Sequence, residues 1–175
     1  MPEFVTHLYD PAVGVCPNIC RLDDFEAERV LDRLRGSTRQ SLKPNYLARR
    51  RATERWLGEA ARAAHGREIA ATPSYFFLGD FSHAADISRP AALVLPISAL
   101  PLDAVTFTLG DSMSVAEQPA RRVYTLARLA ERFVTGDVPA GFGFTDRDGF
   151  QELFIEVQLW ERYSFGRPLR TRFMS

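Results

Sequence analysis

Apolar and polar residues alternate along several short segments of the chain, and this period of two predicts β-strands. Residues 2–9 alternate in this way and are followed by Asp10-Pro11, a pair typical of turns. Three more short segments are rich in β-branched and aromatic residues and are bounded by Gly, Pro or Asp: 74–79, 91–97 and 104–110. We expect all four to be strands, with Pro96 placing 91–97 at a sheet edge or lying near that strand's end.

A helical period of about 3.6 residues marks three other segments, 23–35, 44–66 and 124–136. Asp23 or Asp24 can cap the first of them, and Thr125 the third. The second opens at Pro44 or Asn45 and is closed by Gly66. The apolar positions expected to face the core are Ala27, Val30, Leu31 and Leu34 in the first helix, and Leu47, Trp56, Leu57, Ala60 and Ala64 in the second.

The segment 150–160 (FQELFIEVQLW) fits two periods. As a strand it places Leu153, Ile155, Val157 and Leu159 on one face. As a helix it has Asp148 as cap and an apolar stripe that leaves Ile155 and Leu159 on the wrong side. We favour the strand because it gathers the aliphatic residues together.

Together these elements predict an α+β fold, with about two to three helices packed on a mostly antiparallel sheet of about five to six strands. Residues 1–175 read as a single domain, since neither a linker nor a repeat interrupts the pattern. We expect the tail at 164–175 to be extended.

Net charge and the distribution of apolar residues exclude several classes of protein. The chain has 22 Lys+Arg and 22 Asp+Glu, and this zero net charge makes a general nucleic-acid binder unlikely. Its N-terminus lacks the basic and apolar regions of a secretory signal, and apolar runs stay well short of a membrane span. These features predict a cytoplasmic protein with no membrane partner.

Lys43 is the only lysine of the chain. It does not follow a glycine-rich loop, so a Walker-type nucleotide site is excluded, and its polar loop setting argues against Schiff-base chemistry. Eleven basic against seven acidic residues make 21–66 the basic part of the chain. Within it, the triplet Arg49-Arg50-Arg51 predicts either a solvated helix face or contact with a phosphate-bearing ligand.

Cysteine and histidine are scarce. Cys16 and Cys20 form a C-x3-C pair without a further cysteine, and the three histidines stand apart in the sequence. We therefore expect no metal and interpret the cysteines as reduced, mostly buried thiols. A thiol-dependent activity is the alternative.

Two further segments of the chain carry residues that could act in catalysis. Gly110-Asp111-Ser112-Met113 is similar to the nucleophile block of GDSL-type hydrolases, but that family's later histidine is missing here, so a turn is the better interpretation. If 150–160 is a strand, Glu152 and Glu156 share a face with Phe154 and Trp160. Desolvation there would raise at least one carboxyl pKa toward the range useful for acid–base chemistry.

An ordered set of short motifs resembles the strand order of DarT-like ADP-ribosyltransferases. The motifs are THLYDP (6–11), PSYFFLGD (73–80), AALVLPI (91–97), TFTLGD (106–111) and FQELFIEV (150–157). In that family an early strand carries a histidine, a Tyr-Phe strand lies beneath NAD, and a later strand supplies the catalytic glutamate. The resemblance implies Glu152 as catalytic residue, and His7 and Tyr75 as NAD-binding residues.

The family's arginine-containing segment after the Tyr-Phe strand is replaced here by DFSHAAD, and the resemblance implies Arg89, the nearest arginine downstream, as a further NAD-binding residue. The resemblance thus implies NAD as co-substrate and a small-molecule ligand. The alternative function is a non-catalytic binding or protein-interaction domain. A homodimer or a partner complex of this kind would use aromatic residues at its interface, including Phe165 and Phe173 of the C-terminal tail.

Overall fold

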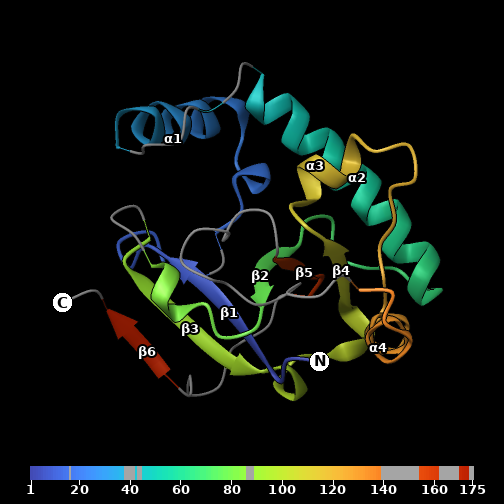
Figure 1. Cartoon of the computed structure of the whole chain (residues 1–175). Helices are drawn as coiled ribbons and strands as arrows, with labels where there is room; N and C mark the ends of the chain where they lie inside the picture. Colours follow the sequence, from blue (N-terminus) through green and yellow to red (C-terminus); the bar gives the residue numbers. More distant parts are fainter. Residues whose placement is uncertain are drawn as a thin grey trace.

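The computed structural model describes residues 1–15, 17–37, 42, 45–85, 89–138, 154–161 and 170–173. Within them lie six strands: β1 Phe4–Tyr9, β2 Ser74–Leu78, β3 Ala91–Pro96, β4 Val105–Leu109, β5 Ile155–Leu159 and β6 Arg170–Phe173. The α-helices of the same residues are α1 Asp24–Ser37, α2 Tyr46–His65, α3 Ser112–Ala116 and α4 Leu126–Thr135. Figure 1 shows these elements, and the predicted α+β class is confirmed.

The strands form one sheet in the order β4-β5-β2-β1-β3-β6. Every neighbouring pair is antiparallel, as predicted. The central neighbours come from distant parts of the sequence, because β2 pairs with β5 on one side and with β1 on the other. Side chains of the first, middle and last thirds of the chain therefore meet in the middle of the sheet.

The sheet is weakly joined between β1 and β2. β1 pairs with β3 along its whole length, from Phe4 to Tyr9, but with β2 only at Val5 and Thr6. β2 in turn continues along β5. The two halves of the sheet, β4-β5-β2 and β1-β3-β6, therefore diverge beyond Thr6. Side chains of β1 and β2 face the gap between them.

The strand predictions hold wherever the structure describes them. The four predicted segments contain β1, β2, β3 and β4, and Pro96 is the last residue of β3. The ambiguous segment 150–160 is a strand over Ile155–Leu159. Its first four residues, 150–153, lie outside the described part of the chain.

Capping groups place the helix ends close to the prediction. The Asp23 carboxylate accepts a hydrogen bond from the Glu26 amide at 2.8 Å, and the Thr125 hydroxyl accepts one from the Arg128 amide at 3.4 Å. Gly66 ends α2 in the left-handed conformation. One helix was not predicted: α3 follows the turn at Gly110, and Asp111 caps it through the Ser114 amide at 2.9 Å.

Helices cover both faces of the sheet. On one face, Leu129 of α4 packs against Phe107 and Val157 in the main apolar core. On the other, Leu57 of α2 packs against Trp160, and α2 and α3 lie over the same side in Figure 1. The predicted apolar stripe of α2 was wrong at Ala64, which is exposed. No helix among the described residues combines the length and apolar character of a membrane span.

Candidate functional site

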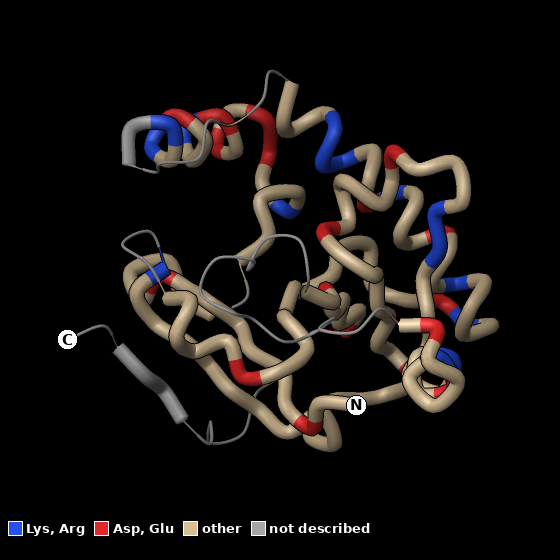
Figure 2. The backbone as a smooth tube through the Cα atoms, viewed as in Figure 1, with Lys and Arg blue, Asp and Glu red and all other residues tan. Residues whose placement is uncertain are grey.

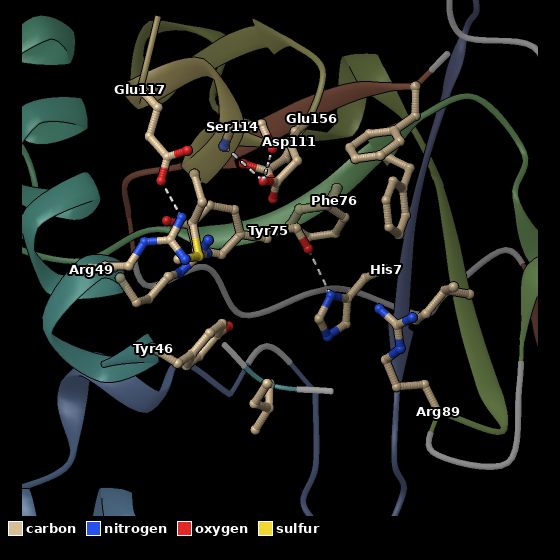
Figure 3. Close-up of a pocket in the computed structure, with 16 residues that line it drawn as sticks. His7, Tyr46, Arg49, Tyr75, Phe76, Arg89, Asp111, Ser114, Glu117 and Glu156 are labelled. Atoms are coloured by element: carbon tan, nitrogen blue, oxygen red, sulfur yellow. Dashed lines mark hydrogen bonds and ion pairs between the residues drawn. The ribbon is translucent and has the colours of Figure 1, made fainter. Parts of the chain in front are cut away.

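A pocket of about 700 Å³ opens where β1 and β2 diverge. Small-molecule sites have volumes of roughly 300–1,000 Å³. Its lining comes from β1, β2, β5, α2, α3 and the loops between them: His7, Leu8, Leu42, Tyr46, Arg49, Arg50, Tyr75, Phe76, Phe77, Arg89, Asp111, Met113, Ser114, Glu117, Phe154 and Glu156. Figure 3 shows Arg49 and Arg89 on opposite sides of the view, with Tyr75 and His7 between them.

Three residues predicted from the sequence line this pocket together: His7, Tyr75 and Arg89. They come from β1, β2 and the residues just before β3. The predicted catalytic residue, Glu152, lies outside the described residues. The carboxylate that β5 does bring to the pocket is Glu156, the other member of the pair on that strand.

His7 bridges the gap between the two halves of the sheet. Its Nδ1 lies 2.8 Å from the main-chain oxygen of Tyr75. Because a carbonyl oxygen only accepts, Nδ1 carries the proton and Nε2 is left as an acceptor. Burial lowers the pKa of His7 to about 4, so the ring is neutral at physiological pH. A neutral imidazole therefore fixes the edge of β2 against β1.

Tyr75 lies between α2 and the pocket. The guanidinium of Arg50 stacks over its ring, with 4.0 Å from the arginine Cζ to the ring centre. Its hydroxyl donates to Glu54 Oε1 at 3.1 Å. Burial raises the pKa of Tyr75 well above its ordinary value, so the phenol stays protonated and remains a donor. Tyr75 is thus a rigid aromatic surface with a positive charge on one side.

Glu54 organises the buried end of α2. Its Oε1 accepts from Asn18 Nδ2 at 2.9 Å and lies 3.4 Å from Arg50 Nε. Both Arg50 and Glu54 are largely hidden, with side-chain exposures of 11% and 3%. Because a buried ion pair needs such additional partners to offset its desolvation, the network fixes the position of Arg50 at the pocket.

Glu156 is buried at the pocket wall, close to Asp111 in Figure 3. Burial raises its pKa to about 7, and the neighbouring Asp111 carboxylate acts in the same direction. The Arg50 guanidinium and hydrogen bonds with Ser112 and Gln158 act the other way. Both the protonated and the ionised carboxyl are therefore accessible near neutral pH, as acid–base or electrostatic catalysis requires.

The arginine triplet separates into three different roles. Figure 2 shows these basic positions at the start of α2. Arg49 and Arg50 line the pocket, with Arg49 paired to Glu117 at its rim. Arg51 turns away and pairs with Asp24 of α1. The solvated-face interpretation therefore fails for Arg50, whose guanidinium is buried beside Tyr75.

The environment of Cys20 does not favour a thiol-dependent activity. The residue is a half-buried free cysteine, and burial raises its pKa to about 12, with the Glu54 carboxylate acting in the same direction. A protonated thiol is a poor nucleophile and a poor metal ligand. Cys16 lies outside the described residues. Among the residues that the structure describes, no group of three or more His, Cys, Asp or Glu could hold a metal ion.

Sequence reasoning missed the inward position of Arg50 and Glu54. A signal was available, because Leu47, Arg50, Glu54, Leu57 and Ala61 follow one another at spacings of three and four along α2. This spacing defines one helix face. A charged pair four residues apart inside an apolar stripe indicates a buried ion pair rather than a solvated one.

The pocket combines a carboxylate with shifted pKa, an aromatic surface and arginines on two sides. This arrangement suits a ligand that has an aromatic ring, a centre that becomes positive and an anionic part. Comparison of the chain with protein-family models, curated proteins and solved structures found no match.

Proposed function

We propose that the pocket binds NAD and catalyses cleavage of its nicotinamide glycosidic bond, with transfer of the ADP-ribosyl group to an acceptor. One observation carries this proposal: His7 on β1, Tyr75 on β2 and Glu156 on β5 line a single pocket although they are far apart in the sequence. His7 and Tyr75 are two of the residues that the resemblance to DarT-like ADP-ribosyltransferases implies, and Glu156 follows the third, Glu152, by four residues. Glu156 takes the catalytic role that the sequence motif gave to Glu152.

The residues present fit the chemistry of this co-substrate. The co-substrate supplies a leaving group, nicotinamide, which departs with the electron pair of the broken bond while the acceptor forms the new bond and loses its proton. Ionised Glu156 stabilises the positive charge that develops at the ribose, since a fixed charge in a buried site acts strongly. Tyr75 offers its ring for stacking, and Arg50 and Arg89 offer positive charge to the diphosphate.

Nicotinamide release on titration with NAD tests the proposal. Binding is followed by calorimetry and release by chromatography, with water as the acceptor in the purified system. We expect binding with slow release, and a loss of release of about 100-fold or more in Glu156→Gln with NAD affinity within a few-fold of the wild type. Binding without release would instead support the non-catalytic binding domain, and absence of binding would overturn the proposal.

Two matched variants show which carboxylate acts. Glu59→Gln changes an exposed carboxylate of α2 outside the pocket and should leave release unchanged. Glu152→Gln separates the residue implied by the motif from Glu156. Retained release in Glu152→Gln together with loss in Glu156→Gln would assign the role to Glu156, whereas the reverse pattern would return it to Glu152.

A further inference from the structure

A row of buried polar side chains lies behind Glu156 on the face of the sheet covered by α2. In the β4–β5 ladder, Thr106 stands opposite Gln158 and Thr108 stands opposite Glu156. Thr106, Thr108 and Gln158 are completely buried. Polar groups in such a position persist only when they are hydrogen-bonded, so the direction of each bond matters.

The indole of Trp160 donates the first of these bonds. Its Nε1–H donates to Thr106 Oγ1 at 2.8 Å, and an indole nitrogen can only donate. The Thr106 hydroxyl in turn donates to Gln158 Oε1 at 3.0 Å. A hydroxyl oxygen can also accept twice, so the direction of the Gln158 amide is decided on its other side, at Thr108.

The NH2 group of Gln158 points toward Glu156. Its Nε2 lies 3.1 Å from Glu156 Oε1 and 3.0 Å from Thr108 Oγ1. The Thr108 hydroxyl is committed to the main-chain oxygen of Gly110 at 2.9 Å, so it accepts from Gln158. The hydrogen bonds thus run in one direction, from Trp160 through Thr106 and Gln158 to the carboxylate.

Other groups also act on Glu156. Arg50 from α2 supplies the opposing positive charge, and Asp111 before α3 supplies a like charge. The phenols of Tyr46 and Tyr75 lie within electrostatic range and are protonated at neutral pH. Ser112 of α3 also hydrogen-bonds the carboxylate and favours its charge. The hydrogen bonds with Ser112 and Gln158 differ from the other influences because they hold the carboxylate in space, and Gln158 is the donor on the sheet side, at Oε1.

We propose that Gln158 is a positioning residue, which holds the carboxylate of Glu156 in its working orientation, and that Thr106 and Thr108 fix the amide of Gln158 in the donating direction. The effect on the carboxylate follows from the contacts alone. The consequence for catalysis rests on the proposed function.

The titration midpoint of Glu156 provides a direct test. We would follow glutamate side-chain carbons by carbon-13 NMR from pH 4 to 9 and assign the Glu156 signal with Glu156→Gln. Gln158→Leu removes the donor and should raise the midpoint by about one pH unit, because a hydrogen bond to a charged group favours the ionised form. In the enzyme assay, the acid limb of kcat/KM should move by the same amount, while KM for NAD changes little.

Since Gln158 is completely buried, Gln158→Leu can fail to fold, and Thr106→Val keeps the test decisive. This variant preserves side-chain shape but removes the hydroxyl that orients the amide, so the midpoint should rise by a smaller amount. Thr53→Val, at a buried threonine of α2 outside this chain of bonds, is the control and should leave the midpoint unchanged.

The outcomes separate this inference from the proposed function. An unchanged midpoint in folded Gln158→Leu or Thr106→Val would overturn the positioning role, even if NAD cleavage is found and depends on Glu156. A raised midpoint in a protein that does not cleave NAD would support the positioning of Glu156 and reject the transferase.

Discussion

Burial and hydrogen bonding act in opposite directions on the carboxyl group of Glu156. Burial is the larger influence and raises the pKa to about 7, against an ordinary value of 4.5. The folded protein therefore binds a proton more tightly at this position than the unfolded chain does. Holding a carboxylate in this state reduces stability at neutral pH, which is a common property of residues placed for chemistry rather than for packing.

This imbalance predicts a pH-dependent effect of Glu156→Gln on stability. The stability that Glu156 contributes is complete below about pH 4.5 and is lost as pH rises through about 7, because the folded state must then release a proton from a buried group. Relative to the wild type, Glu156→Gln should gain up to about 3 kcal/mol in unfolding free energy between pH 4 and pH 8.

Urea denaturation at several pH values measures this difference. Comparison with the variant at each pH is necessary because His7 acts in the opposite sense: burial lowers its pKa to about 4, so its contribution is present above pH 6.5 and lost as pH falls through 4. A difference between wild type and variant that does not change with pH would contradict the raised pKa of Glu156.

At the scale of elements, one face of α2 both packs in the apolar core and forms part of the pocket wall. Leu57 and Ala61 pack against Trp160 at its C-terminal half. One to two turns earlier, the same face carries Glu54 and Arg50, which form the buried ion pair at the pocket. The helix thus joins the apolar core to the charged wall of the site, and a change in its packing would move Arg50.

We expect the ion pair on α2 to matter for stability mainly when it is broken. Arg50→Met leaves Glu54 buried without its counter-charge and should lower the unfolding free energy by about 3–5 kcal/mol. The double variant Arg50→Met/Glu54→Met should recover much of that loss, since neither charge is then left alone. Chemical denaturation of both variants and of Glu54→Met completes a double-mutant cycle.

Arg55→Met, which removes an exposed arginine of the same helix, is the matched control and should change stability by less than about 0.5 kcal/mol. Additive losses in the double variant would show that Arg50 and Glu54 do not depend on each other.

At the scale of the whole molecule, the narrow junction between β1 and β2 makes the pocket. Divergence of the two halves of the sheet exposes His7 and Tyr75 to the same space. Thr6 strengthens the junction from within: its buried hydroxyl donates to the Gly79 oxygen at 2.6 Å and accepts from the Phe81 amide at 2.9 Å. The side chain of Thr6 therefore provides hydrogen-bond partners for two main-chain groups of the segment after β2.

Thr6→Val should weaken this junction. The methyl group that replaces the hydroxyl removes its hydrogen bonds to the Gly79 carbonyl and the Phe81 amide, at a cost of about 2–4 kcal/mol in unfolding free energy. Thermal or urea unfolding measures the loss, and hydrogen exchange at the Phe81 amide should become faster. Thr6→Ser keeps the hydroxyl, so its loss should be much smaller; equal losses in both variants would disprove the role of these bonds.

Local patterns predicted the elements well because their causes are local. Alternation along β1 and the apolar, aromatic or β-branched runs of β2, β3 and β4 reflect burial on a pleated strand, and capping by Asp23 and Thr125 acts within one helical turn. For the candidate site, the resemblance drew attention to His7, Tyr75 and Arg89, and these residues line one pocket. Their catalytic and binding roles stay predictions.

The remaining features depend on pairing between distant segments. The order β4-β5-β2-β1-β3-β6 follows from contacts between segments far apart in the sequence, and the divergence after Thr6 depends on where two such pairings end. The choice of Glu156 as the pocket carboxylate likewise depends on the register of β5 against β2 and β4. A one-residue change in that register would turn Glu156 to the opposite face.

The sequence by itself thus determined the α+β class, the strands β1 to β5, the helices α1, α2 and α4 and the aliphatic face of β5, because periodicity and capping are properties of neighbouring residues. Tertiary structure alone decided that Glu54 accepts from Asn18 and Tyr75, that Gln158 donates to Glu156 and that the sheet opens a pocket at its centre. These features have one physical reason in common: burial and hydrogen-bond direction are set by whichever distant segments come to surround a side chain.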